Sequence, residues 1–259
     1  MNIVVCVKQT VDLQQVRIRR ETREPVLENI PLTLGNIDKN ALEEGVRLRE
    51  QHGGRVVVVS AGSDALGETI KEALAMGADE AVLVTGPQLD GAESAVAAEV
   101  LARAIGKIGE VDLILLGEGS GDNYSGQVGP RLAELLGMPQ VGFVNGLQVE
   151  GGRLRATRSL EDCLEVVEVE MPAVVAVVSE INEARIPAVT AILKAGRKPK
   201  QELTPGELGF DLAGMQPRVR TLSNLAPEQE RKRILFSEGL DADVDNLIKA
   251  LLSEGAAVR

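Results

Sequence analysis

The chain has few side chains that carry out acid–base, metal or stacking chemistry. It contains no tryptophan, one tyrosine and three phenylalanines, so it lacks an aromatic platform for stacking bases or a flavin ring. Its single histidine, His52, is expected at the exposed end of a helix, without the cleft and orienting partner that a general base needs. We therefore expect no catalytic residue and no metal site.

Cysteine is equally scarce. Cys6 lies in an apolar strand pattern and Cys163 beside acidic residues, and the two do not form the CxxC spacing of zinc or redox sites. We expect both to be reduced, buried thiols. Carboxylates on helices, such as Glu43 and Glu44, are expected on a solvated face or at a cap.

Basic residues are outnumbered by acidic ones. The 28 Lys and Arg against 39 Asp and Glu give a formal net charge of −11, which repels nucleic-acid phosphates and anionic membranes. No signal-peptide pattern opens the sequence, and no apolar run approaches the roughly 20 residues of a membrane helix. The sequence predicts a soluble, cytoplasmic protein that does not bind nucleic acid.

Short β-branched runs alternate with helical stretches through the first half of the chain. Strands are expected at residues 2–8, 55–61, 80–86 and 111–117, and helices at residues 38–53, 64–78 and 92–109. The continuous apolar runs at 56–59 and 113–116 leave no polar face for water, so helices should cover both sides of a mostly parallel sheet. The sequence predicts a doubly wound α/β fold.

The pattern changes after Gln140. Period-two alternation around Gly151 and Gly152 predicts an antiparallel hairpin followed by a buried strand. We place the α/β domain at residues 1–195, and a linker with a C-terminal extension at residues 196–259. The extension ends in a helix with an apolar stripe at Val244, Leu247, Ile248, Leu251 and Leu252.

A glycine-rich segment, "GEGSGDNYSGQVGP" at residues 117–130, follows a buried strand. Ligands of open parallel sheets lie beyond the carboxyl ends of strands, where glycines let backbone N–H groups and a helix N-terminus approach an anion. The segment is either such a phosphate cradle or a flexible surface loop. It matches neither the GxGxxG nor the GxxxxGK[ST] pattern.

Several ordered segments resemble the β subunit of electron transfer flavoproteins. They are residues 4–12, 36–50, 68–84, 111–140 and 182–198. The signature segment of that family is matched by Arg158, Glu161, Asp162, Glu165, Pro172, Val174 and Val175. Cys163 departs from it, because Gly or an acidic residue is usual there.

The resemblance implies a heterodimer with an α subunit that carries the redox-active FAD. It implies a domain of the adenine-nucleotide-binding, HUP or flavodoxin-like class that holds AMP, or a second FAD in electron-bifurcating members. The nucleotide would contact Val7, Lys8, Asn36, Asp38, Ser60, Ala61, Gly62, Gly117, Asp122, Asn123, Tyr124, Ser125, Gly126, Gln127 and Val128. The complex would shuttle electrons between acyl-CoA or other dehydrogenases and a quinone reductase or other acceptor.

The run "GQVGP" at residues 126–130 is similar to the bifurcating branch, which favours FAD at this site and oxidation of NADH by the complex. Asn123 and Tyr124 stand where that branch usually has Gly and Asp. AMP and FAD both stay open, and the chain is an enzyme subunit only in the second case.

The resemblance also implies a docking segment for redox partners at residues 181–195, with Val189 at the place of an anchoring leucine and Ile192 beside it. From the residues alone, Val189 and Ile192 would instead form one face of a short helix packed on the domain. The resemblance gives Arg158 a role at the subunit interface or the flavin, and packs the C-terminal arm on the α subunit.

Two other functions share the strand–helix alternation. A stand-alone adenine-nucleotide sensor of the universal-stress-protein type would form a homodimer and leave the long arm unexplained. An ATP-using enzyme of the related pyrophosphatase fold would carry a Ser- and Gly-rich loop after the first strand, where this chain has "KQTVD".

Overall fold

The computed structural model describes residues 1–212, 219, 221–228 and 232–255. Its centre is a nine-stranded sheet with the order β11-β10-β9-β12-β8-β1-β6-β7-β13. Every neighbouring pair from β9 to β13 is parallel, and the β9-β10-β11 end is antiparallel. The strands are β1 Asn2–Cys6, β6 Arg55–Gly62, β7 Glu80–Thr85, β8 Leu113–Gly117, β9 Gln140–Glu150, β10 Arg153–Ser159, β11 Leu164–Glu170, β12 Ala173–Val177 and β13 Lys200–Leu203.

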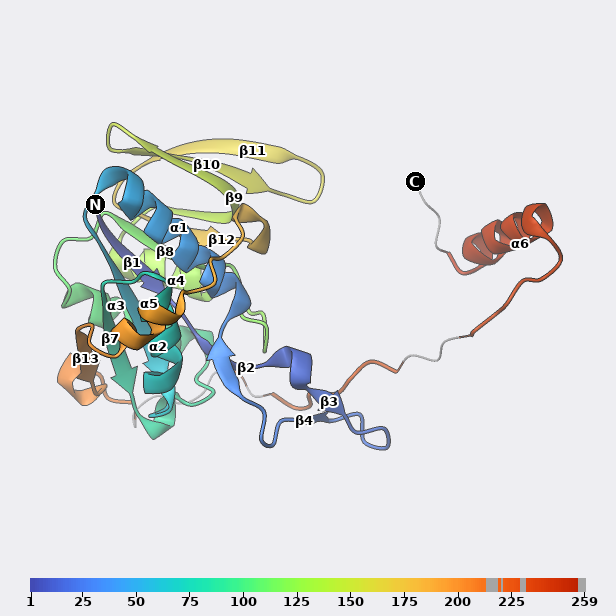
Figure 1. The fold of residues 1–259 in the computed structure, drawn as a ribbon, viewed down its shortest axis with the longest axis horizontal. Helices are drawn as coiled ribbons and strands as arrows, with labels where there is room; N and C mark the ends of the chain where they lie inside the picture. The colour runs from blue at the N-terminus through green and yellow to red at the C-terminus, as the bar shows by residue number, and fades with distance from the viewer. Residues whose placement is uncertain (213–218, 220, 229–231, 256–259) are drawn as a thin grey trace.

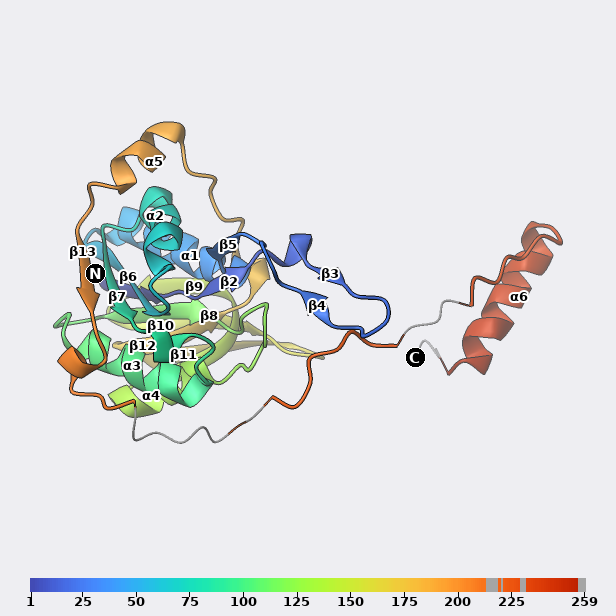
Figure 2. The same cartoon turned by 90° about the horizontal axis from the view of Figure 1, so that it is seen from below.

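Helices cover both faces of this sheet (Figure 2). Helices α1 (Asn36–His52) and α2 (Leu66–Met76) lie on one face, and α3 (Ser94–Gly106) and α4 (Val128–Leu136) on the other. Because successive strand residues point to opposite faces, Ile3 and Val5 join the core under α1, whereas Val4 and Cys6 join the core under α3. The predicted doubly wound fold is confirmed.

Shorter elements connect and extend these layers. A ladder of β2 (Gln9–Val11) with β5 (Leu32–Leu34) leads into a projecting hairpin of β3 (Arg17–Ile18) and β4 (Pro25–Val26). Single turns of 3-10 helix lie at η1 Leu13–Gln15, η2 Pro87–Leu89, η3 Ser179–Ile181 and η4 Gly206–Leu208. The remaining helices are α5 Val189–Ala195 and α6 Leu240–Ser253.

The predicted hairpin is confirmed as β9 and β10, joined at Gly151 and Gly152 (Figure 1). Both glycines have positive φ, 57° and 81°, as a two-residue hairpin turn of type I′ requires. The expectation for Cys163 is wrong: its side chain is exposed, because it lies in the turn that joins β10 to β11. Cys6 is buried as expected.

The carboxylates of Glu43 and Glu44 are buried in α1, contrary to expectation. Glu43 accepts hydrogen bonds from Arg47 Nε at 2.6 Å and from Arg185 Nε at 2.7 Å, and Arg185 also pairs with Glu50 at 2.8 Å. Burial opposes ionisation, but the hydrogen bonds from Arg185 and Arg47 lower the pKa of Glu43. These bonds hold the chain between η3 and α5 against α1.

The sheet continues past residue 195, because β13 pairs with β7. Farther along, α6 has no buried residue, and its predicted stripe from Val244 to Leu252 is exposed. Figure 1 places α6 apart from the sheet. In the described residues, no helix has the length and apolar character of a membrane span.

Substituting Arg185→Ala should lower the free energy of unfolding by about 2 kcal/mol, because the 3% exposed carboxylate of Glu43 loses charged donors. Urea denaturation monitored by circular dichroism measures the change. The matched control is Arg153→Ala, because Arg153 pairs with Glu170 at 3.9 Å and both side chains are exposed. This substitution should lower the free energy of unfolding by less than about 0.5 kcal/mol. Equal losses in the two variants would contradict this view of Arg185.

Candidate functional site

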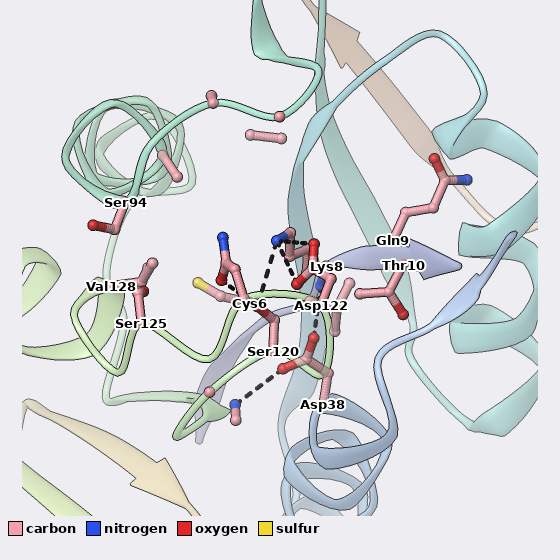
Figure 3. Close-up of a pocket in the computed structure, with 18 of the residues that line it drawn as sticks. Cys6, Lys8, Gln9, Thr10, Asp38, Ser94, Ser120, Asp122, Ser125 and Val128 are labelled. Carbon is pink, nitrogen blue, oxygen red and sulfur yellow. Dashed lines mark hydrogen bonds and ion pairs between the residues drawn. The ribbon is translucent and has the colours of Figure 1, made fainter. Parts of the chain in front are cut away.

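A cavity of about 460 Å³ opens at the carboxyl edge of the sheet, beside the ends of β1, β6 and β8 (Figure 3). The chain leaves β1 for β6 on one side and later returns to place β8 on the other side of β1. The strand order therefore reverses between β1 and β8. In open α/β sheets the turns separate at such a point and leave a crevice for a ligand.

Most of the residues predicted to bind a nucleotide line this cavity. They are Val7, Lys8, Asp38, Ala61, Gly117, Asp122, Asn123, Ser125, Gly126, Gln127 and Val128. The structure thus brings together residues from the turns after β1, β6 and β8 with the start of α1. That these residues bind a nucleotide stays a prediction.

Asn36, Ser60, Gly62 and Tyr124 are not among the lining residues. The buried Ser60 hydroxyl donates to the Val7 carbonyl at 2.7 Å, so it joins β6 to the end of β1. The Tyr124 hydroxyl donates to Glu118 Oε2 at 3.1 Å, and its ring lies against Gly119. Tyr124 therefore closes the glycine-rich loop on itself, with a positive φ of 41°.

Asp38 links the two strands on either side of the reversal point. Its Oδ2 accepts from the backbone N–H of Lys8 at 2.8 Å, and its Oδ1 accepts from the N–H of Gly117 at 3.1 Å. A Cβ atom at Gly117 would lie 2.6 Å from Oδ1, and one at Gly35 would lie 2.7 Å from Oδ2. Both positions therefore require glycine, because the carboxylate occupies the space of a side chain.

Burial raises the pKa of Asp38 to about 7. The N–H groups of Lys8 and Gly117 and the positive charge of Lys8 act in the opposite direction, and the charge of Asp122 adds to the rise. The side chain is 7% exposed, so water does little to stabilise the ionised form. Asp38 is thus a buried support for the cavity rather than an open ligand group.

The glycine-rich segment forms a wall of the cavity and ends at the N-terminus of α4. Gly126 has a φ of 64°, and the N-cap residue Gln127 makes no side-chain capping bond. The first turn of α4 carries no acidic residue. Gln127 Oε1 instead accepts from Ser94 Oγ at 3.3 Å, which brings the start of α3 beside the start of α4. Such a helix N-terminus, with unpaired N–H groups and a positive dipole end, favours an anion.

Several lining residues were not among those predicted to bind the nucleotide, including Ser94, Ala97 and Leu101 of α3 and the following two groups. Leu89, Asp90, Gly91 and Ala92 follow β7, and Gln9, Thr10, Val11, Leu27 and Leu32 come from the β2–β5 ladder and the chain beside it. The first group follows a predicted strand at the same edge of the sheet. Its place in the wall could have been predicted, because ligands of open parallel sheets bind beyond the carboxyl ends of the strands. The second group has only short runs, too brief for a periodicity signal.

Comparison with known proteins decides the family. A family model described as "Electron transfer flavoprotein domain" matches residues 26–208. The chain is 38% identical to an electron transfer flavoprotein subunit beta of Thermoanaerobacterium thermosaccharolyticum over 98% of each chain, and 33% identical to one of Bacillus subtilis over 100% of each. The chain belongs to the electron transfer flavoprotein β-subunit family. It is also 36% identical to the caffeyl-CoA reductase-Etf complex subunit CarD of Acetobacterium woodii, over 77% of this chain and 76% of that one.

The docking residues implied by the electron transfer flavoprotein resemblance lie outside the cavity. Val189 and Ile192 are 73% and 53% exposed on α5, so the alternative in which they pack on the domain is wrong. Only Ala195 of this helix is buried. Arg158 lies in β10, where its Nη1 donates to Glu165 at 2.5 Å and its Nε donates to the Gly142 carbonyl at 3.0 Å.

Substituting Asp38→Asn should destabilise this electron transfer flavoprotein subunit by about 1–3 kcal/mol at pH 5.5, because an amide nitrogen cannot accept a hydrogen bond, whereas both oxygens of the protonated wild-type carboxyl can accept from the two N–H donors. The pKa of Asp38 rises from 3.8 to about 7 on folding, so the folded wild-type protein binds a proton that the unfolded chain releases. The contribution of Asp38 is complete below pH 3.8 and declines as the pH rises through 7. Urea titrations from pH 5.5 to 8 should show that the difference in free energy of unfolding between the wild type and Asp38→Asn becomes smaller up to about pH 7. A constant difference would contradict the raised pKa.

Proposed function

We propose that this chain is the β subunit of a heterodimeric electron transfer flavoprotein and that the cavity at the β1/β8 reversal point binds an adenine nucleotide. The observation that carries the proposal is the position of the uncapped α4 N-terminus in the wall of that cavity. Membership of the β-subunit family supports the electron-transfer role and the α partner.

The residues present fit an adenine nucleotide. A volume of about 460 Å³ lies in the range of small-molecule sites. The backbone N–H groups at Gln127 and Val128 suit a phosphate, and Leu89, Leu101 and Leu116 offer an aliphatic wall to a planar base. An FAD bound in the complex supplies the electron-carrying isoalloxazine, while this chain binds the nucleotide and holds it in place.

The nucleotide is AMP or FAD. The "GQVGP" run at the start of α4 favours FAD, by its similarity to bifurcating members of the family. With FAD at this site the complex would oxidise NADH and divide the electron pair between two acceptors. With AMP it would be a simple carrier between dehydrogenases and a quinone reductase or other acceptor.

Two exposed apolar surfaces support the proposed partners. Helix α5 presents Val189, Ile192 and Leu193 to solvent, and the Arg185–Glu43 pair fixes the chain that precedes it, as a docking segment for redox partners requires. The stripe on α6 is unpaired in the part of the chain that the structure describes, which suits packing on the α subunit.

The deciding experiment is to co-express the chain with its α subunit and measure flavin and AMP per purified heterodimer. Two FAD without AMP would establish the bifurcating form, and NADH reduction of the flavins would follow. One FAD with one AMP would establish the carrier form. A chain that purifies as a nucleotide-bound homodimer and takes no flavoprotein partner would overturn the proposal in favour of a stand-alone sensor.

Ser125 provides a test of the phosphate position. Its Oγ accepts from the N–H of Gln127 at 3.5 Å, directly before α4. Substituting Ser125→Asp places a carboxylate where the phosphate would bind, and should weaken nucleotide binding by about tenfold or more through like-charge repulsion. The same change should leave the thermal unfolding temperature equal or higher, because an acidic residue at a helix N-terminus is favourable.

The matched control is Ser125→Asn, which has a similar shape and no charge. Binding measured by calorimetry should change by less than about threefold in this variant. If both variants bind the nucleotide equally weakly, the charge has no effect, and the proposed phosphate position at the α4 N-terminus is contradicted.

A further inference from the structure

The cavity has an unusual charge balance for a nucleotide site. Lys8 is the only cationic side chain among the described residues that line it. The acidic residues in the same wall are Asp38, Asp90, Glu118 and Asp122. Polyphosphate sites such as P-loops use a lysine that reaches the outer phosphates, so the environment of Lys8 decides which phosphates the cavity accepts.

The positive charge of Lys8 is already paired with a carboxylate of the protein. Its Nζ donates to both carboxylate oxygens of Asp122, at 2.8 and 2.6 Å, and to Ser120 Oγ at 3.4 Å (Figure 3). Ser120 in turn donates to Asn123 Oδ1 at 3.0 Å, which orders the loop that carries Asp122. A two-oxygen contact of this kind is a strong charge-assisted interaction. An incoming phosphate would have to displace a carboxylate to use this cation.

We propose that Asp122 is a specificity-determining residue: by neutralising Lys8 it makes the cavity select AMP, or the diester phosphates of a dinucleotide, and reject ADP and ATP. The proposal rests on the function proposed above and adds the charge class of the ligand. It follows from geometry, since the remaining anion-binding groups are the neutral N–H donors at the start of α4.

Those donors suit a ligand with a small total phosphate charge. A terminal phosphate carries about −1.5 to −2 charges at pH 7, and a helix N-terminus offers the equivalent of roughly half a positive charge. The diester phosphates of a dinucleotide carry about one charge each and together match the charge of AMP. ADP and ATP would bring further charge into a wall in which the acidic side chains outnumber the one cation. Like-charge contacts of this kind lower affinity, although water partly screens them here, because the side chains of Lys8 and Asp122 are 40% and 34% exposed.

The alternative is that the Lys8–Asp122 pair only holds the glycine-rich loop in place. In that case the loss of Asp122 would weaken the binding of every adenine nucleotide to the same extent. The ratio of affinities therefore separates the two roles, whereas the affinity for one nucleotide does not.

The test uses the αβ heterodimer freed of the nucleotide at this site, with EDTA present to exclude magnesium complexes. Calorimetric titrations with AMP, ADP and ATP are made on the wild type, Asp122→Asn, Lys8→Met and the double variant. The wild type should bind AMP at least about tenfold more tightly than ATP. Asp122→Asn should shift the AMP:ATP ratio toward ATP by about tenfold, because it releases Lys8 and removes a carboxylate.

The double variant tests whether the effect passes through Lys8. It should lose most of the gain that Asp122→Asn shows for ATP, a non-additive result that identifies the pair as the source. The far-ultraviolet circular dichroism spectrum and the thermal unfolding temperature of each variant serve as the controls for folding.

Comparable affinity of the wild type for AMP and ATP would overturn the proposal, and so would a ratio that Asp122→Asn leaves unchanged. Either result leaves the nucleotide-binding function standing, since AMP would still bind. Failure of the wild-type heterodimer to bind any of the three nucleotides would overturn this proposal, and failure to bind FAD as well would overturn the proposed function.

Discussion

The hydrogen bonds from the N–H groups of Lys8 and Gly117 to Asp38 are the constraint on which the site depends. They join the ends of β1 and β8, where the strand order reverses, and the partly exposed Lys8–Asp122 ion pair links the same two turns nearer the solvent. The same carboxylate excludes side chains at Gly35 and Gly117. The cost is a buried acid whose pKa rises to about 7 through desolvation. The shape of the cavity is thus maintained by a group that does not need to touch the ligand.

This arrangement explains how a chain so poor in reactive side chains could form the proposed binding site. The groups that would face an anion are backbone N–H donors at the start of α4, which follows the glycine turn at Gly126. Backbone donors keep their charge state at any pH and lose little entropy on binding, since the fold has already positioned them. The proposed function requires that a nucleotide be held in place and not that a bond be broken, and such a site suits that task.

The parallel core was predictable because its strands are apolar on both faces and its helices follow a clear period, as at Val56–Val59 and in α3. The turns after β1, β6 and β8 were predictable for the same reason, since parallel strands end at one edge. The burial of Glu43 could not be predicted, because its partner Arg185 lies 142 residues away in the sequence and no local sequence pattern indicates that they pair. The exposure of Cys163 and the β2–β5 wall depend likewise on turns and short ladders without a period of their own.

Helix α1 carries both the support of the cavity and the anchor of the segment before α5. Asp38 and Glu43 lie roughly 7.5 Å apart along its axis, at 1.5 Å per residue. A helix of this length behaves as a rigid rod, so a tilt that moves one of these side chains moves the other as well. A residue inserted between them would rotate Glu43 by about 100° around the axis and turn its carboxylate away from Arg185. The five-residue spacing of Asp38 and Glu43 in α1 therefore helps to set the distance between the cavity and the exposed helix α5.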